Sequence, residues 1–483
     1  MPYLNVNQVE SELSAAAGPP NQLITELITL PHPTWEGRTC RAIKIANGSG
    51  LRRIGVCFIG GLHAREWGSP DILIFFVQQL IRAFLANTGI TLGGKSFTAT
   101  QIRSIVNGLD TFVFPQVNPD GRNYSMTVDP MWRKNQRPGP SGNPTCLGVD
   151  INRNFEFLWN YPAYFSPSAP ITNSQDPCNP DVYIGPSAAS EPETKNVVSM
   201  LDNHPNIRFF VDLHSYTEKI LYNWGDDQNQ STDSNMNFRN PAFNGQRGIA
   251  NDAAYREHID SSDQTLAINL AQRMRDSIQA ARGRTYTVDT FFSLYPTAGT
   301  STDYAFSRHF ADPSKEKVHS FTIEWGQEFQ PPYTEMQNII QEVTAGLLEF
   351  SVGIVEAVGY PTEPRVSIAP QVQYLANRTY TVRAVDPYTS VDVPGTVAVY
   401  NPYNPNQPVA SRTVRTNQPF TIAFVKPAWT ANPPQVPVIR VTPDDKSKYK
   451  TASRLVGQGG LLPRAEDLAL ELQAPPRKAP ALE

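Results

Sequence analysis

Three segments of the chain place histidines and carboxylates where they could bind a metal ion or move a proton. His63 and Glu66 stand three positions apart after the apolar run 55–60. His214 ends a second apolar run, and Glu324 ends a third. Imidazole and carboxylate groups are ordinary zinc ligands, and a carboxylate next to the metal can serve as general base. These residue types indicate a candidate metal site, provided that the three segments meet in the fold.

Each of these residues has a plainer interpretation when it stands alone. A His-x-x-Glu pair arises easily by chance, so His63 could be a partly exposed loop residue. His214 could be a core histidine whose ring is satisfied by hydrogen bonds, because a buried polar group needs a partner. Glu324 could be a solvated strand end. The metal site is therefore a hypothesis about the set and not about any single residue.

An α/β fold would bring the three segments together. Between about residues 40 and 360, apolar β-rich runs alternate with helical patterns, and we predict strands at 54–60, 111–117, 208–213 and 320–323. Parallel strands end at one edge of a sheet, where open α/β folds place their sites. We therefore predict a mixed, mostly parallel central sheet flanked by helices, with the chemistry at that edge.

Two helices are predicted from end signals and periodicity. The first has Ser69 as N-cap and Pro70 as first residue, and it runs to about Ala86. The second follows Pro332. Apolar residues recur in it at steps of three and four, which draws one buried stripe: Met336, Ile340, Val343, Leu347, Phe350 and Ile354.

The composition changes near Gly359. From Pro361 to Glu483 there are 18 prolines and alternating β-type runs, which is typical of a small all-β domain with prolines at strand edges and turns. We predict a first domain at 1–358, a Pro-rich β-sandwich-like domain at 359–458 and a flexible tail at 459–483. Residues 226–252 are expected to form a long surface loop.

Charge and hydropathy exclude some classes of partner. Lys and Arg total 41 against 45 Asp and Glu, so the chain lacks the basic excess with which proteins bind nucleic acid. No uninterrupted apolar stretch of about 18 residues occurs, so we expect no membrane span. We expect a monomer.

Further polar residues lie between the first three segments. Arg133 and Arg153 present planar forks that match a carboxylate or a developing oxyanion, and Asn152 adds a neutral donor. Tyr295 lies in a loop of small residues that could move. Isolated arginines are more often surface residues, and a loop tyrosine more often only packs.

Taken in order, these motifs resemble the zinc metallocarboxypeptidases of the pancreatic carboxypeptidase A/B type, peptidase family M14. The resemblance covers roughly residues 7–357, and the Pro-rich C-terminal region has no counterpart in the digestive enzymes. It is carried by these motifs: Trp35-Glu-Gly-Arg38, His63-x-x-Glu66, Asn118-Pro-Asp-Gly121, Trp132-Arg133-Lys134, Asp150-x-Asn152-Arg153-Asn154, His214-Ser-Tyr216, Tyr295 and Glu324.

The resemblance implies one Zn²⁺ per chain, held by His63, Glu66 and His214, with the fourth position open for water. Asp150 would orient His63 through a hydrogen bond. Glu324 would be the general base and Arg133 the group that stabilises the oxyanion. The remaining residues would bind the substrate, a peptide or protein C-terminus: Asn152 and Arg153 at its carboxylate, Tyr295 closing over it, and Arg65 and Tyr216 as secondary contacts.

Substrate preference depends on the position of Thr302, which lines the floor of the terminal-residue pocket in relatives. A neutral hydroxyl cannot balance a buried ammonium, so we predict neutral apolar or aromatic C-terminal residues. Asp289 or the Asp226-Asp227 pair could instead produce a preference for basic residues. Two other functions remain open: a zinc amidohydrolase of cell-wall or modified peptides, and an inactive peptide-binding module.

The cysteines bear on the compartment. Cys146 and Cys178 stand at places similar to the family's disulfide, which favours an oxidising environment and a secreted protein. Cys40 and Cys57 lie in apolar β contexts and are expected to be buried thiols. Residues 1–30 show neither a signal-peptide pattern nor an inhibitory pro-segment, so a cytoplasmic location stays open.

Overall fold

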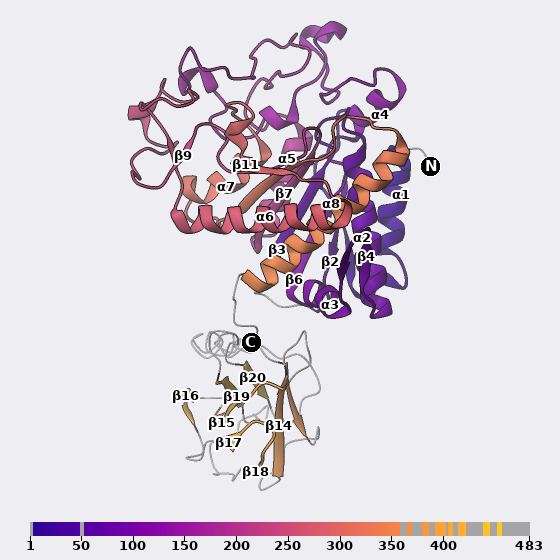
Figure 1. Ribbon diagram of the computed structural model, residues 1–483, viewed down its shortest axis with the longest axis vertical. Helices are drawn as coiled ribbons and strands as arrows, with labels where there is room; N and C mark the ends of the chain where they lie inside the picture. Colours follow the sequence, from indigo (N-terminus) through magenta and orange to yellow (C-terminus); the bar gives the residue numbers. More distant parts are fainter. Residues whose placement is uncertain are drawn as a thin grey trace, which may run out of the picture. The chain divides into compact units, whose positions relative to one another are not determined.

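The chain divides into two compact units, unit 1 (Met1–Val355) and unit 2 (Glu356–Glu483) (Figure 1). The computed structural model describes residues 3–48, 53–357, 365–369, 379–385, 392–401, 404–408, 414–421, 438–444 and 452–455. The predicted tail at 459–483 lies outside these residues.

Unit 1 is built on a mixed sheet. Its described residues form eight strands in the order β1-β2-β6-β3-β7-β12-β8-β11. The four central strands β6, β3, β7 and β12 are parallel to one another, whereas β8 is antiparallel to β12 and β2 to β6. This confirms the predicted mixed, mostly parallel sheet. The strands are β1 Thr25–Thr29, β2 Arg41–Ile45, β3 Ile54–Gly60, β6 Leu109–Phe114, β7 Ile207–His214, β8 Lys219–Tyr222, β11 Thr287–Thr290 and β12 His319–Glu324.

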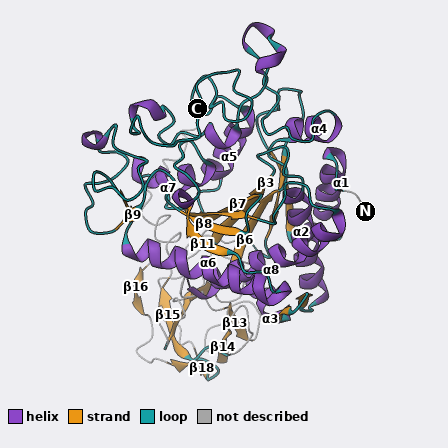
Figure 2. Ribbon diagram, turned by 45° about the horizontal axis from the view of Figure 1, so that its top comes forward, coloured by secondary structure: helices purple, strands orange, loops and turns teal. Residues whose placement is uncertain are grey.

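Helices cover both faces of this sheet (Figure 2). Successive strand residues point to opposite faces: Phe209 packs against Phe350 of α8, whereas Phe210 lies in a core cluster with Met200 of α5 and Phe306 of α7. The sheet is therefore buried on both sides, as its uninterrupted apolar strands require. The helices are α1 Val6–Ala17, α2 Gly68–Ala86, α3 Ala99–Gly108, α4 Pro119–Thr127, α5 Pro192–Asn203, α6 Ser261–Arg282, α7 Ser301–Ala311 and α8 Tyr333–Ala357, with the short strands β4 Ile90–Leu92, β5 Lys95–Phe97, β9 Asn229–Gln230 and β10 Glu257–His258.

The N-terminus of α2 differs from the prediction. The helix begins at Gly68, with Trp67 at the N-cap and no side-chain capping bond. Ser69 lies inside the first turn, and its hydroxyl donates to the carbonyl of Leu213 on β7 instead of capping the helix. The predicted cap was wrong because the turn after Glu66 starts the helix two residues earlier and buries the serine against the sheet.

Both α2 and α8 are long and apolar enough, by length and composition, to span a membrane. The structure gives these properties another explanation, because 61% of the apolar window of α2 and 83% of that of α8 are buried. All members of the predicted stripe on α8 are buried. The two helices therefore supply core surface to the sheet.

The segment 226–252 is irregular, as predicted, but it is not simply a surface loop. Asp226, Asp227 and Arg247 are almost completely buried. Asp227 accepts a hydrogen bond from the backbone of Gly248, and the Arg247 guanidinium lies over Tyr255 and donates to several backbone carbonyls. The prediction of a surface loop was wrong at these three residues, because a segment with few apolar residues can still contain buried ones. Here the buried residues are charged, and their hydrogen bonds hold parts of the segment together.

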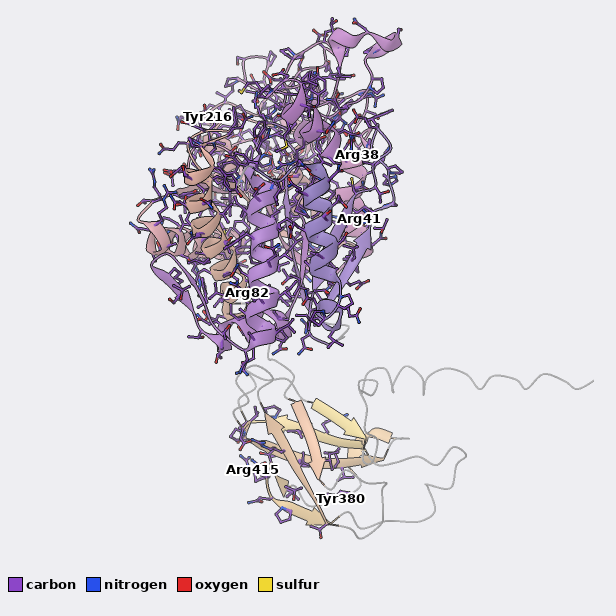
Figure 3. All side chains as sticks on the ribbon, turned by 90° about the vertical axis from the view of Figure 1, so that its right-hand side faces the viewer. Arg38, Arg41, Arg82, Tyr216, Tyr380 and Arg415 are labelled. Carbon is purple, nitrogen blue, oxygen red and sulfur yellow. A yellow bond between two sulfur atoms is a disulfide. The ribbon has the colours of Figure 1, made fainter. Side chains whose placement is uncertain are left out.

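The described residues of unit 2 form two small sheets, β13-β14-β18 and one built on β16-β15-β19-β20 with β17 beside β15. Apolar residues from both sheets form one core that includes Tyr380 (Figure 3), Val397 and Ile439. The described part of this unit is all-β, in agreement with the sequence. Its strands are β13 Arg365–Ala369, β14 Thr379–Val385, β15 Gly395–Asn401, β16 Asn404–Pro408, β17 Val414–Arg415, β18 Pro419–Thr421, β19 Val438–Pro443 and β20 Ala452–Leu455.

Candidate metal centre and substrate recess

The three strands that end in polar residues meet at one edge of the sheet. Glu324 of β12 is the register partner of His214 on β7, and Gly60 at the end of β3 is the partner of Leu213. His63 and Glu66 lie in the turn between β3 and α2. The predicted convergence of the three segments is therefore present.

His63, Glu66 and His214 form a buried cluster of metal-type ligands. One ligand atom from each can be chosen so that all three lie within 4.8 Å of one another. Nδ1 of His63 is 2.8 Å from Glu66 Oε1 and 3.0 Å from Nδ1 of His214, which is itself 3.1 Å from Glu66 Oε2. Two imidazoles and one carboxylate that turn toward a common point are the donor set of a catalytic zinc site, so these residues fit the ion.

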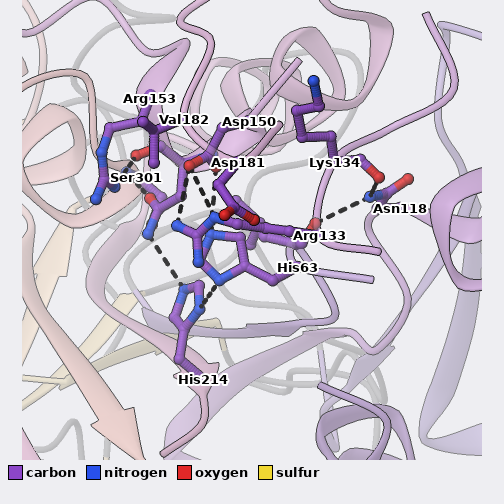
Figure 4. Close-up of polar contacts among 12 residues, drawn as sticks. His63, Asn118, Arg133, Lys134, Asp150, Arg153, Asp181, Val182, His214 and Ser301 are labelled. Carbon is purple, nitrogen blue, oxygen red and sulfur yellow. Dashed lines mark hydrogen bonds and ion pairs between the residues drawn. The ribbon is translucent and has the colours of Figure 1, made fainter. Parts of the chain in front are cut away.

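The outer nitrogens of both histidines face carboxylates; Figure 4 labels the two histidines and Asp150. Nε2 of His63 lies 3.3 Å from Asp150 Oδ1, and Nε2 of His214 lies 2.9 Å from Asp212 Oδ2. Such partners fix the tautomer and the orientation of ligating histidines. Asp150 was predicted from the sequence. Asp212 was missed, although its position two residues before His214 on one strand puts both side chains on the same face.

Asp150 also holds Arg133. Its Oδ2 accepts from Nε and Nη2 of the guanidinium at 3.0 and 2.9 Å. Arg133 lowers the pKa of the buried Asp150 carboxyl far below its usual range despite the opposing effect of burial. One ionised carboxylate therefore orients a metal-type ligand and an arginine together.

Glu324 lies half-buried beside this cluster. Its removal from water raises its pKa to about 8, and Glu66 adds to the rise, whereas His214 and Arg133 oppose it. A carboxyl group whose pKa lies near neutrality can both accept and return a proton in one reaction cycle. This is the property required of a general base in hydrolysis.

Arg153 and Tyr295 lie next to one another. The Arg153 guanidinium is 5.9 Å from the Tyr295 ring centroid, and its Nε is buried with no hydrogen-bond partner among the described residues. Tyr295 is 36% exposed, whereas Arg153 is 1% exposed. The Asn152 side chain accepts from the backbone of Ser301 and faces His214 Nε2 at 3.4 Å. Asn152 therefore links this pair to the His63, Glu66 and His214 cluster.

Comparison with known proteins identifies the family of this chain. A family model described as zinc carboxypeptidase matches residues 20–346, which is more than half of the chain. The chain belongs to the zinc carboxypeptidase family.

Individual relatives agree with this assignment. Carboxypeptidase A4 of Mus musculus is 29% identical over 274 residues, 56% of this chain and 52% of the relative. Carboxypeptidase B of Astacus astacus is 34% identical over 193 residues, 40% of this chain and 55% of the relative. Most of the curated relatives that it matches are covered over only about half of their length. The crystal structure of carboxypeptidase A from Helicoverpa armigera shares the fold with a TM-score of 0.56 at 21% identity, covering 74% of each chain.

The residues predicted as secondary contacts lie at the rim of the site of this zinc carboxypeptidase family member. The Arg65 guanidinium stacks over Phe329 at 4.4 Å, and Tyr216 meets the same ring edge-on at 4.8 Å. Tyr216 is 43% exposed and lies at the periphery of unit 1 in Figure 3. Asp181 lies 3.3 Å from Arg65. Phe329 and Asp181 carried no sequence signal, because loop residues join the rim only through the fold.

Thr302 lies in the first turn of α7 and is 3% exposed, and its hydroxyl has no hydrogen-bond partner among the described residues. The acidic residues named for the pocket make the following contacts. Asp226 faces Arg247, Asp227 accepts from backbone amides, and Asp289 accepts from the amide of Thr290.

The predicted disulfide is present between Cys146 and Cys178. Cys40 and Cys57 are buried free thiols, as expected, and burial raises the pKa of both far above the usual range. The disulfide joins the segments before Asp150 and after Thr172, the residue whose hydroxyl accepts from Arg153. It therefore fastens the loop that flanks Arg153.

Proposed function

We propose that this protein is a zinc-dependent exopeptidase that hydrolyses the C-terminal peptide bond of peptides and releases single residues. The observation that carries the proposal is the buried His63, Glu66 and His214 cluster with Glu324 on the neighbouring strand, in register with His214. We assign the activity to residues 1–358 and treat 359–458 as an accessory domain.

His63, Glu66 and His214 would hold one Zn²⁺. When bound, Zn²⁺ supplies Lewis acidity, which lowers the pKa of water and polarises a carbonyl group. Asp150 and Asp212 face the outer nitrogens of the two imidazoles and would orient both rings so that the inner nitrogens face the ion. Burial of the cluster keeps competing water away from the ligands.

Glu324 would take the proton of the attacking water and return it to the leaving amine. A general acid-base step of this kind typically contributes about 10²- to 10⁴-fold. Arg133 would donate to the oxygen that gains charge as the carbonyl is attacked. Asp150 already binds Nε and one N–H of Nη2 of Arg133, so Nη1 and the second N–H of Nη2 remain for the substrate.

Selection of the chain end would come from Arg153. A terminal carboxylate can form charge-assisted hydrogen bonds with its guanidinium, including the unpartnered Nε, and internal peptide bonds lack this anion. Tyr295 is exposed enough to move toward the bound terminus, and Asn152 would add a polar contact. Arg65 and Tyr216 at the rim would contact the residue upstream of the scissile bond.

We further propose a preference for neutral apolar or aromatic C-terminal residues. Thr302 supplies no charge to a pocket floor, and Asp226 and Asp227 are committed to the neighbouring loop. A substrate ammonium or guanidinium would be buried there without a counter-charge, which costs several kcal/mol. The disulfide supports secretion or another oxidising compartment.

The test is hydrolysis of hippuryl-Phe by the purified protein after metal analysis, with and without a chelator. Hippuryl-Phe amide is the matched control, because it keeps the side chain and loses the terminal anion. We expect one zinc per chain, chelator-sensitive turnover and at least a 10²-fold lower kcat/KM for the amide. Glu324→Gln should keep zinc and lose turnover, and His214→Ala should lose both.

Other results would point elsewhere. Equal rates on acid and amide would contradict the exopeptidase assignment and favour an amidohydrolase, to be tested with γ-linked and D-residue peptides. Zinc binding without turnover on any of these substrates would favour a peptide-binding module. A higher kcat/KM for hippuryl-Arg than for hippuryl-Phe would show that the pocket prefers basic residues.

A further inference from the structure

Trp325 follows Glu324 directly and is fully buried. Its backbone N–H donates to the carbonyl of His214 at 2.8 Å, which extends the β12–β7 ladder by one bond beyond Glu324. Gly326 then turns the chain away at a positive φ of 65°. Glu324 is paired with His214 of β7 and with Lys219 of β8, so contacts made by the next residue, Trp325, bear directly on where the end of β12 lies.

A hydroxyl on α2 completes this end of the sheet. The Trp325 indole Nε1 donates to Ser69 Oγ at 2.9 Å, and Ser69 Oγ donates in turn to the carbonyl of Leu213 at 2.9 Å. Ser69 is itself fully buried. One hydroxyl, acting as acceptor and donor, thus joins β12, β7 and α2.

We call the two hydrogen bonds from Trp325 Nε1 to Ser69 Oγ and from Ser69 Oγ to the Leu213 carbonyl the relay. Each residue in the relay is a close chain neighbour of a site residue. Trp325 follows Glu324, Leu213 precedes His214, and Ser69 lies three residues after Glu66. The printed hydrogen bonds of the Trp325 indole and the Ser69 hydroxyl reach no side chain of the proposed ligands, and Trp325 contacts His214 through the main chain. The effect of the relay can therefore be exerted only through the positions of the backbone segments that carry the ligands.

Close packing leaves little freedom around the relay. A Cβ built on Gly68 would lie 2.8 Å from Trp325 Cη2 and 2.5 Å from Met336 Sδ, and one on Gly60 would lie 3.0 Å from Ser69 Cβ. The indole thus packs directly on the backbone of α2. The Trp325 and Ser69 side chains are therefore closely confined, and such packing can hold β12 and α2 in a fixed relative position.

We propose that Ser69 and Trp325 are positioning residues that set the Glu324 carboxylate relative to the His63, Glu66 and His214 cluster. The inference rests on the proposed role of Glu324 as base. Misplacement of a reacting group by about 1 Å can cost about 10²-fold in rate. Loss of the relay lets the end of β12 move, so it lowers kcat while substrate binding at Arg153 is retained.

The experiment compares Ser69→Ala, Trp325→Phe and the double variant in the full-length zinc-loaded protein with hippuryl-Phe. We expect kcat to fall about tenfold or more in each, KM to change less than about threefold, and zinc content to stay at one per chain. Because the two residues act through one bond, the kcat of the double variant should be no lower than that of the more impaired single variant. Ser69→Ala suffices if Trp325→Phe fails to fold.

Ser277→Ala is the matched control. Its hydroxyl is equally buried and donates to the carbonyl of Ala345 at 2.8 Å between α6 and α8, far from the site in the chain and on other elements. It should lower Tm without changing kcat. A folded Ser69→Ala protein with wild-type kcat, or multiplicative losses in the double variant, would overturn the proposal. Near-normal turnover by Glu324→Gln would instead remove the base assignment on which it rests.

Discussion

Replacement of Asp212 by Asn tests whether the outer partners of the histidines tune metal binding. Asp212 Oδ2 lies 2.9 Å from Nε2 of His214 and also accepts from the Ser301 hydroxyl. The substitution keeps the shape of the side chain but removes the negative charge that makes His214 a stronger donor. Loss of such a partner typically costs about 10- to 100-fold in metal affinity, which corresponds to about 1.4 to 2.7 kcal/mol.

The assay is competition for zinc between the protein and a chromophoric chelator of known affinity, at fixed pH. Asp303→Asn is the control, because Asp303 is equally buried but hydrogen-bonds to Asn223, Thr300 and Gly225 instead of a histidine. We expect a weakened zinc complex for Asp212→Asn and an unchanged one for Asp303→Asn. Equal zinc affinity in wild type and Asp212→Asn would refute the reasoning.

Three further outcomes are expected. Burial raises the pKa of Glu193 from 4.5 to about 8. The folded state therefore binds the Glu193 proton more tightly than the unfolded state, and the free energy of unfolding falls as pH rises from about 4.5 to 8. Glu193→Gln should raise Tm at pH 8 more than at pH 5, and an equal change at both pH values would contradict this. Thr302→Asp should raise the kcat/KM ratio of hippuryl-Arg to hippuryl-Phe by at least about tenfold, with an unchanged ratio counting against Thr302 as pocket floor. Replacing both Cys146 and Cys178 by Ser opens a link across 32 positions and should lower the free energy of unfolding by about 3–4 kcal/mol in denaturant titration; a loss below about 1 kcal/mol would not fit.

The sequence predicted the elements whose signals are periodic. Strand ends at Gly60, His214 and Glu324 could be located because buried parallel strands read as unbroken apolar runs, and parallel strands end at one edge. The stripe on α8 could be predicted because its apolar residues recur at steps of three and four. These signals are local, and the sheet then combines them into one site.

Features that depend on tertiary context were predicted less well. Ser69 has the residue type of a cap, but its hydroxyl found stronger use against β7 once α2 packed on the sheet. Asp212 carries no motif in the sequence, and its role becomes visible only when the structure shows it beside the ring of His214. The segment 226–252 looked exposed because its buried groups are charged, and composition cannot show that Arg247 and Asp227 are satisfied by neighbouring backbone.

The register between β7 and β12 has a consequence for how this chain can vary. His214 and Glu324 are separated by a long stretch of sequence that includes α6 and α7, yet hydrogen bonds between two adjacent strands set their spacing. Insertions or deletions between them leave that spacing intact so long as the ladder forms. A slip of a single residue in the ladder would instead turn Glu324 to the opposite face of the sheet. The spacing of His214 and Glu324 therefore tolerates changes in the length of the connecting sequence but does not tolerate a change in the register of β7 and β12.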